Sequence, residues 1–456
     1  MIETNLEFAK NDLREVVNLF GDEETLSVRH IFKEGDGRVV NTVIFAGQSI
    51  AVCNLLSKDF TEIERKRYIK RYAKLAVYKA LSKILKKDLP WGALTGIRPT
   101  KLAYQELDRS GEFKEFFTGV MKVSEEKTSL IETILTEQTG IYKKDDNNTD
   151  FFVFIPFCPS RCKYCSFISA DIKSAQKSVD KYVETLIYEI NESKKFIKNL
   201  RSIYIGGGTP VALSDEHLDR ILSALDDINT GVEFTVEAGR PDRITESNLK
   251  ILKKHKVTRI CINPQTFKDE TLVRLKRNHT AEEVVEKFDL AKGDFIVNMD
   301  LIAGLEGESL EDFKASVDKA ISLAPDNITV HTLCIKRGSA LAEENSRLSD
   351  DFISEMVDYA RNKLIENGYN PYYLYRQKYM RGNLENVGYA KKGTACVYNV
   401  NVMEEISSTV ACGANAISKR VYNGGERIER EASPKDVNTY ISKIDTILQA
   451  KSKLFG

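Results

Sequence analysis

The stretch Phe-Cys-Pro-Ser-Arg-Cys-Lys-Tyr-Cys at residues 157–165 carries Cys158, Cys162 and Cys165, which can face one point from a short loop. Thiolate ligands favour iron–sulfur clusters or zinc. A structural zinc site uses four protein ligands, but the nearest histidine is His217, and no second pair of cysteines lies nearby. The spacing therefore favours a four-iron cluster held at three corners, with the fourth iron open to another molecule, over a zinc site.

A regular strand and helix pattern surrounds this loop. Apolar strand candidates occur at 151–157, 202–206, 232–238, 257–263, 294–301 and 326–334. They alternate with helical stretches near 177–198, 214–226, 245–255, 268–291 and 308–323. Strand, helix and strand at this spacing predict parallel βαβ units. Six such units predict an α/β fold with a partial barrel, whose chemistry lies on loops after the carboxyl ends of the strands.

Further candidate site residues lie at those strand ends. The run Gly206–Thr209 follows the second strand, Glu237 ends the third, Gln265 follows the fourth and Asp300 lies near the end of the fifth. Glycines let the backbone approach a ligand, although a plain turn explains them equally well. A carboxylate buried without a partner is costly, so Glu237 and Asp300 are either ligand-binding groups or ordinary surface and capping residues.

Taken together, the Cys-x3-Cys-x2-Cys spacing and these companions resemble the radical S-adenosylmethionine (SAM) enzymes. The resemblance implies a [4Fe–4S] cluster on the three cysteines, with SAM chelating the open iron. It also implies that SAM is bound by Gly207, Gly208, Thr209, Glu237, Gln265, Arg277 and, near the ribose, Asp300. Arg277 enters through the run Arg-Asn-His-Thr at 277–280, which resembles an Arg-x-His-Thr signature of coproporphyrinogen oxidase-like members.

Three further stretches, at 91–101, 382–389 and 398–405, resemble the HemZ-type oxygen-independent coproporphyrinogen III dehydrogenases. This resemblance covers the whole chain. It implies an oxidoreductase of haem biosynthesis that decarboxylates two propionates of coproporphyrinogen III to vinyl groups and yields protoporphyrinogen IX. It also implies radical chemistry from SAM, with reduced flavodoxin or ferredoxin as electron donor.

Other features keep alternatives open. Well-characterised oxidases of this kind carry a further cysteine where this chain has Phe167, and haem-chaperone relatives also have an aromatic residue there. Haem-degrading radical methyltransferase-like relatives share the neighbourhoods at 373–378 and 383–386. A haem-binding carrier and an anaerobic haem-degrading enzyme therefore stay alternatives. His331 is either a cavity base or a core histidine, and Lys336–Arg337 with 372–378 are candidates for binding an acidic substrate.

Composition limits the class of protein. In 456 residues, 67 Lys and Arg balance 67 Asp and Glu, which argues against a general binder of nucleic acid or membrane surfaces. No stretch of 18 apolar residues and no apolar leader occur, so we expect a cytoplasmic protein. The remaining five cysteines, Cys53, Cys261, Cys334, Cys396 and Cys412, are expected to be buried thiols.

Length predicts two or three domains. We expect an N-terminal α/β accessory region at 1–90, a helical segment and polar linker at 91–150, the partial barrel at 151–335, and a C-terminal α+β extension at 336–456 that covers the substrate.

Overall fold

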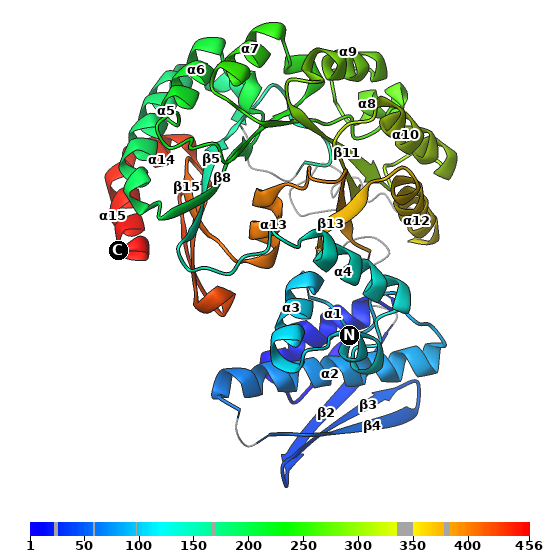
Figure 1. Cartoon of the computed structure of the whole chain (residues 1–456). Helices are drawn as coiled ribbons and strands as arrows, with labels where there is room; N and C mark the ends of the chain where they lie inside the picture. Colours follow the sequence, from blue (N-terminus) through cyan, green and yellow to red (C-terminus); the bar gives the residue numbers. More distant parts are fainter. Residues whose placement is uncertain (22–25, 58–59, 97, 166–169, 335–349, 378–383) are drawn as a thin grey trace. The chain divides into compact units, whose positions relative to one another are not determined.

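The computed structural model describes residues 1–21, 26–57, 60–96, 98–165, 170–334, 350–377 and 384–456. These residues divide into two compact units, Met1–Glu132 and Thr133–Gly456 (Figure 1). Phe167, Lys336, Arg337 and Lys378 lie outside the described residues. Across the described parts of the chain, no helix is both long enough and apolar enough to span a bilayer.

The first unit is built on a small sheet with the order β1 (Ile2–Thr4), β2 (Val28–Gly35), β3 (Arg38–Phe45) and β4 (Gln48–Leu55). The strands β2, β3 and β4 form an antiparallel meander. Helices α1 (Lys10–Asn18) and α2 (Glu62–Leu85) pack against this sheet. Alternation along β3 buries Val39 and Val43, which is the pattern of a strand covered on one face.

Helices α3 (Pro99–Ser110), η2 (Phe116–Val120) and α4 (Glu125–Glu137) follow, and α4 crosses the boundary between the two units. Trp91 has no exposed surface. Gly92 has φ +50°, and a Cβ there would lie 2.2 Å from the carbonyl oxygen of Met121. In the stretch at 91–101, the tryptophan and its neighbouring glycine are therefore explained by packing within the first unit.

The second unit contains the partial barrel that the sequence predicts. Its six parallel strands are β5 (Asn148–Ile155), β8 (Asn199–Gly207), β9 (Glu233–Gly239), β10 (Arg259–Ile262), β11 (Ile296–Ala303) and β12 (Asn327–Thr332). They lie side by side in chain order within a sheet that does not close. Helices cover the outer face of the sheet (Figure 1). The helices along this part of the chain are α5 (Ile172–Ser193), α6 (Asp215–Ser223), α7 (Glu246–Lys254), α8 (Asp269–Arg274), α9 (Ala281–Ala291) and α10 (Leu310–Leu323).

The helical stretch near 268–291 is two helices, α8 and α9, rather than one. Lys276 has φ +57°, which ends the first helix. The side chain of Thr280 accepts a hydrogen bond from the backbone N–H of Glu283 in a capping box that starts the second. The residues between the two helices include Arg277, so this break places a predicted site residue on a loop.

The chain beyond the barrel joins both edges of the same sheet. After α12 (Asp350–Glu366), β14 (Asn386–Ala390) pairs antiparallel with β12 and carries β13 (Asn370–Tyr375) at the edge. Helix α13 (Val397–Glu404) leads to β15 (Ser408–Cys412), which is parallel to β5. The strands β16 (Ile417–Tyr422) and β17 (Arg427–Ala432) follow at that edge. Eleven of the described strands of this unit thus form one sheet.

The five other cysteines differ in burial. Cys261, Cys396 and Cys412 are buried as expected. The prediction is wrong for Cys53, which is exposed, and Cys334 is only half-buried. Strand β4 alternates, so Ile50 and Val52 are partly covered while Cys53 faces solvent.

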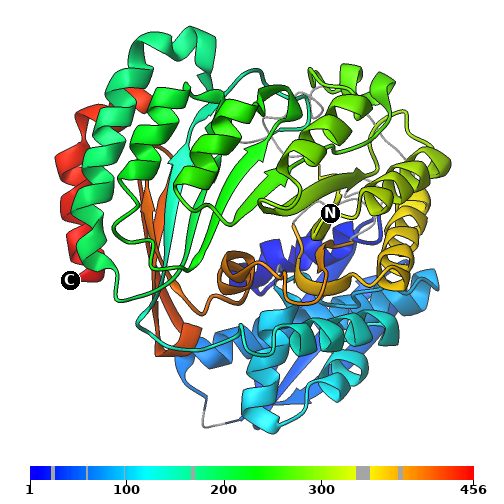
Figure 2. The ribbon, with the colours of Figure 1, turned by 45° about the horizontal axis from the view of Figure 1, so that its top comes forward.

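The last helices, α14 (Val437–Ser442) and α15 (Ile444–Phe455), pack against α5 (Figures 1 and 2). Lys451 of α15 forms a buried ion pair with Glu189 of α5, at 2.8 Å between Nζ and Oε1. The other carboxylate oxygen accepts hydrogen bonds from Tyr440 Oη at 2.6 Å and the backbone N–H of Gly413 at 2.7 Å. One carboxylate therefore joins the barrel, the end of β15 and the C-terminal helices.

Removing Lys451 leaves the Glu189 charge buried without its cation, so Lys451→Ala is expected to lower the free energy of unfolding by about 3 kcal/mol. Urea denaturation followed by circular dichroism measures this change. The exposed neighbour Lys453 provides the control, because Lys453→Ala should leave the urea midpoint unchanged. Equal midpoints for the two variants would contradict the anchoring role of the buried pair.

Candidate cofactor site

The cysteine loop begins directly after β5. Short strands β6 (Phe157–Cys158) and β7 (Ala170–Asp171) pair at its base. Cys162 is buried, and Cys158 and Cys165 are half-buried. The backbone N–H of Cys165 donates to the carbonyl of Cys162 at 3.1 Å, so the last two cysteines share one tight turn. All three thiols therefore sit on one short segment at the carboxyl end of the first barrel strand.

No group of three His, Cys, Asp or Glu side chains in the described part of the chain is arranged to share a single metal ion. In a four-iron cluster each cysteine binds a different iron, so the sulfur atoms need not converge on one point. The donor set of this loop fits such a cluster better than it fits zinc.

The glycine turn after β8 fits against the cysteine loop. The backbone N–H of Gly208 donates to the carbonyl of Ile155 at 2.7 Å, and that of Thr209 donates to Phe157 at 2.8 Å. A Cβ on Gly208 would lie 2.4 Å from the carbonyl oxygen of Phe157. This distance is too short for any side chain at position 208. Thr209 Oγ1 lies 3.7 Å from Cys158 Sγ. The glycines are therefore required by the close approach of two backbone segments, whether or not a ligand also uses them.

Arg277 reaches the cysteine loop from the break between α8 and α9. Its guanidinium donates to the hydroxyl of Tyr164 at 2.9 Å and to the carbonyl of Asn263 at 2.6 Å. Tyr164 lies between the second and third cysteines, and the backbone N–H of Lys163 donates to Leu275 O at 3.1 Å. The structure thus places Arg277 against the loop and the end of β10.

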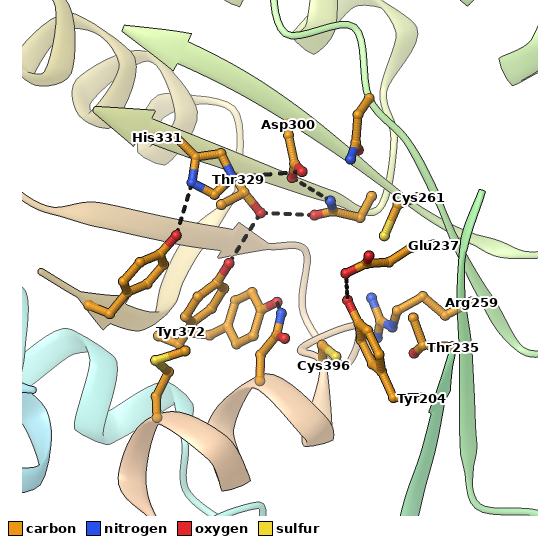
Figure 3. Close-up of a pocket in the computed structure, with 16 residues that line it drawn as sticks. Tyr204, Thr235, Glu237, Arg259, Cys261, Asp300, Thr329, His331, Tyr372 and Cys396 are labelled. Atoms are coloured by element: carbon orange, nitrogen blue, oxygen red, sulfur yellow. Dashed lines mark hydrogen bonds and ion pairs between the residues drawn. The ribbon is translucent and has the colours of Figure 1, made fainter. Parts of the chain in front are cut away.

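A cavity of about 190 Å³ lies in the second unit, on the inner side of the barrel strands (Figure 3). Strands β8 to β13 and helix α13 supply its wall. Its lining consists mainly of hydroxyl, amide and carboxylate side chains: Tyr204, Thr235, Glu237, Arg259, Cys261, Asn263, Asn298, Asp300, Thr329, His331, Tyr372, Tyr373, Tyr375, Cys396, Asn399 and Met403. A polar ligand suits this lining better than an apolar one.

Glu237 connects this cavity to the glycine turn. Its carboxylate accepts a hydrogen bond from the Tyr204 hydroxyl at 2.5 Å and another from the backbone N–H of Gly207 at 3.2 Å. Burial among these atoms raises the pKa of Glu237 to about 7, although both hydrogen bonds act to lower it. The nearby charge of Asp300 raises the pKa further. A cation bound in the cavity would relieve this cost.

Asp300 of β11 lines the same cavity, two strands along the sheet from Glu237 (Figure 3). Burial acts to raise its pKa, but contacts with His331 and Asn298 outweigh burial and hold the pKa below its usual value. Asn298 Nδ2 donates to its carboxylate at 2.8 Å, and His331 Nε2 lies 3.7 Å away. The other nitrogen of His331 lies 3.3 Å from the hydroxyl of Tyr375. His331 therefore lines the cavity with Asp300 and Tyr375 near its two ring nitrogens, and its role as a cavity base stays a prediction.

Several buried polar atoms here have no hydrogen-bond partner among the described residues. They are Thr235 Oγ1 and Asn263 Oδ1, which belong to lining residues, and Gln265 Oε1. Gln265 has φ +68°, and its backbone N–H donates to Asp300 O at 2.8 Å. Buried polar groups are normally paired, so these atoms fit a missing polar ligand. Together with two carboxylates, they suit a molecule with a diol and a positive charge, as in SAM.

The structure brings together only part of the predicted site. Glu237 and Asp300 line the cavity, whereas Gly207, Gly208, Thr209, Gln265 and Arg277 are absent from its lining. Sequence reasoning did not assign a role in this cavity to Arg259, Cys261, Cys396 or the tyrosines. The sequence suggested the run Tyr-Tyr-Leu-Tyr at 372–375 only as part of a stretch that binds an acidic substrate and as part of a likeness to haem-degrading relatives. Three aromatics in four residues of one strand were the available signal.

The raised pKa of Glu237 makes a pH dependence measurable. Between pH 4.5 and about 7, the carboxyl is protonated in the folded protein and ionised in the unfolded chain. The folded state then binds the extra proton, so its stability falls as pH rises through this window. Glu237→Gln is expected to lack this decline. The difference in unfolding free energy between the two proteins, measured across this range without ligand, should change with pH, and parallel curves would contradict the burial of the charge.

The family model of the radical SAM superfamily matches residues 152–320. The chain is 37% identical over 421 residues to the oxygen-independent coproporphyrinogen-III oxidase-like protein HemZ of Bacillus subtilis strain 168, covering 87% of this chain and 83% of that protein. It is 34% identical over 235 residues to the heme chaperone HemW of Lactococcus lactis strain IL1403, covering 49% of this chain and 60% of HemW.

The solved structure of coproporphyrinogen III oxidase HemN from Escherichia coli, a radical SAM enzyme, has a TM-score of 0.54 and 20% sequence identity. The match covers 70% of this chain and 72% of HemN, and it supports the partial-barrel fold. Radical SAM enzymes use a [4Fe–4S] cluster and SAM, in agreement with the cofactors predicted from the sequence. The chain therefore belongs to the radical SAM superfamily and, within it, to the family of HemZ-like oxygen-independent coproporphyrinogen-III oxidase-like proteins.

Proposed function

We propose that this protein oxidatively decarboxylates two propionates of coproporphyrinogen III to give protoporphyrinogen IX. The observation that carries the proposal is that Glu237, which lines the acidic cavity, accepts a hydrogen bond from the glycine turn that packs against the three-cysteine loop, within a HemN-like sheet. The similarity to the HemZ relative supports the choice of substrate class, because the match covers 83% of that protein.

In this proposal Cys158, Cys162 and Cys165 hold the cluster, and SAM occupies the cavity beside it. When bound and reduced, the cluster and SAM would supply a 5′-deoxyadenosyl radical to remove a hydrogen atom from each propionate, and loss of CO2 with one electron passed to an acceptor would complete each vinyl group. Asp300 is suited to the ribose hydroxyls, because its contacts with Asn298 and His331 favour the ionised form, which accepts hydrogen bonds.

Glu237 is suited to the positive charge of the ligand rather than to its hydroxyl groups. Since its pKa is about 7 in the ligand-free cavity, a positively charged ligand favours its ionised form and gains an ion pair shielded from bulk water. Gly207, Gly208, Thr209, Gln265 and Arg277 stay predicted SAM contacts. The backbone of the glycine turn and the Gln265 amide are adjacent to the residues that line the cavity, which is consistent with that prediction.

The tetrapyrrole needs a separate region. Four carboxylates call for several Arg or Lys partners, but the cationic Arg259 in the lining is paired with Glu233 at 3.1 Å. Arg376, which follows β13, is buried, and burial lowers its pKa to about 10. We assign the cavity to SAM and the tetrapyrrole to a region outside it. Reduced flavodoxin or ferredoxin is the proposed electron donor.

Haem binding is the second candidate. It is favoured by the similarity to heme chaperone HemW and by Phe167, where well-characterised oxidases have cysteine. A carrier would bind haem stoichiometrically without consuming SAM. A haem-degrading enzyme would destroy the haem absorbance only when SAM and a reductant are supplied.

The cluster assignment predicts that Cys158→Ala, Cys162→Ala and Cys165→Ala each prevent stable cluster assembly, because two thiolates hold it too weakly. Iron and sulfide content after anaerobic reconstitution, with the visible spectrum, is the measurement. Cys53→Ala is the matched control, since Cys53 is exposed on β4 in the other unit, and it should retain full cluster content. A wild-type cluster in any of the three loop variants would remove that cysteine from the ligand set.

The substrate assignment predicts that the reconstituted protein converts coproporphyrinogen III to protoporphyrinogen IX when SAM and reductant are present. Anaerobic incubation followed by mass spectrometry should also find 5′-deoxyadenosine in proportion to product. Cys162→Ala is the negative control. SAM cleavage with coproporphyrinogen III unchanged would keep the radical SAM assignment and reject this substrate, and the same assay with haem would then separate carrier from degrading enzyme.

A further inference from the structure

Arg240 is a buried cation outside the lining of the cavity. It follows the end of β9, three residues after Glu237, and is 4% exposed. Asp242 binds its guanidinium through two hydrogen bonds, from Nε to Oδ1 at 2.8 Å and from Nη2 to Oδ2 at 3.1 Å. This paired geometry is the strongest form of arginine–carboxylate contact. Asp242 therefore fixes the direction in which the third nitrogen points.

That third nitrogen faces the cysteine loop. Nη1 of Arg240 lies 3.1 Å from Ser160 Oγ and 3.7 Å from Cys162 Sγ. Both distances allow a hydrogen bond, since sulfur accepts at longer range than oxygen. Burial opposes the charge on Arg240, but Asp242 and then Cys162 raise its pKa above the usual value. The guanidinium thus stays charged beside a sulfur atom and away from solvent.

We propose that Arg240 is a positioning residue that donates a charge-assisted hydrogen bond to the Cys162 thiolate and so raises the reduction potential of the cluster. The inference rests on the proposed function, because it requires Cys162 to be a ligand. One-electron reduction adds a negative charge to the cluster and its sulfur ligands. A fixed cation with a hydrogen bond to one sulfur stabilises the reduced form more than the oxidised form.

Lysine cannot replace arginine in this role. The planar fork lets two nitrogens hold Asp242 while the third reaches the loop, whereas an ammonium is a point charge on a flexible stem. Partners outside the ligand set commonly tune metal sites in this way. The charge of Asp242 weakens the field of Arg240 at the cluster, so the directed hydrogen bond carries the effect together with the remaining charge.

The test is a redox titration of the reconstituted full-length protein without SAM or substrate, monitored by electron paramagnetic resonance. For Arg240→Gln we expect a tenfold lower ratio of reduced to oxidised cluster at a fixed applied potential, a midpoint shift of about 59 mV to lower values. Arg243→Gln is the matched control, because it removes an equal charge from the same turn. Arg243 is 37% exposed in its side chain and lies 4.0 Å from Asp242, so the midpoint should stay at the wild-type value.

Arg240→Lys keeps the charge, and it tests the hydrogen bond to Cys162 if the Gln variant binds too little iron. A lower midpoint in the Lys variant supports the directed hydrogen bond, and a wild-type midpoint overturns it. A wild-type midpoint in a fully loaded Arg240→Gln protein also overturns the inference, while the proposed function stands. Absence of any cluster in the wild-type protein would instead defeat the proposed function.

Discussion

The contact between the glycine turn and the cysteine loop is the constraint on which the proposed cofactor site depends. Two backbone hydrogen bonds, from Gly208 to Ile155 and from Thr209 to Phe157, join the ends of β5 and β8. They bring the backbone so close that no side chain fits at Gly208. The preceding residue of the turn, Gly207, donates its backbone N–H to Glu237. The same contact therefore connects the cysteines to the cavity. Loss of this approach would separate cluster and SAM positions.

Electrostatics gives the two sides of the site opposite characters. The cavity contains Glu237 and Asp300, which suit a cationic ligand that carries hydroxyl groups. The cysteine loop is contacted by two buried arginines, Arg240 and Arg277, which suit a cluster whose thiolates and sulfides are negative. Glu237 lies on β9 and Arg240 directly after it, whereas Arg277 lies on the loop between α8 and α9, so the two arginines reach the cysteine loop from segments beyond the strands.

The chain beyond the barrel completes the cavity. Tyr372, Tyr373 and Tyr375 of β13, with Cys396 and Asn399 at the start of α13, form one wall. Glu233 of β9 accepts hydrogen bonds from the backbone N–H groups of Val397 and Tyr398 and so holds the first turn of α13. The wall is therefore attached to the barrel by a carboxylate at the beginning of a barrel strand, far in sequence from the helix it caps.

The sequence alone determined the local chemistry and the class of fold. Cysteine spacing favoured a cluster, and alternating strands and helices predicted six parallel units. The position of Glu237 and Asp300 in apolar strands drew attention to them, and the resemblance to radical SAM enzymes assigned them to SAM. These signals are local, so short stretches carry them. Only the tertiary structure decided that Gly208 is required by backbone contact, that His331 faces the cavity, and that Arg240 lies beside Cys162. Each of these facts joins residues that are distant in sequence, and their distances depend on strand order and register, which no local pattern specifies.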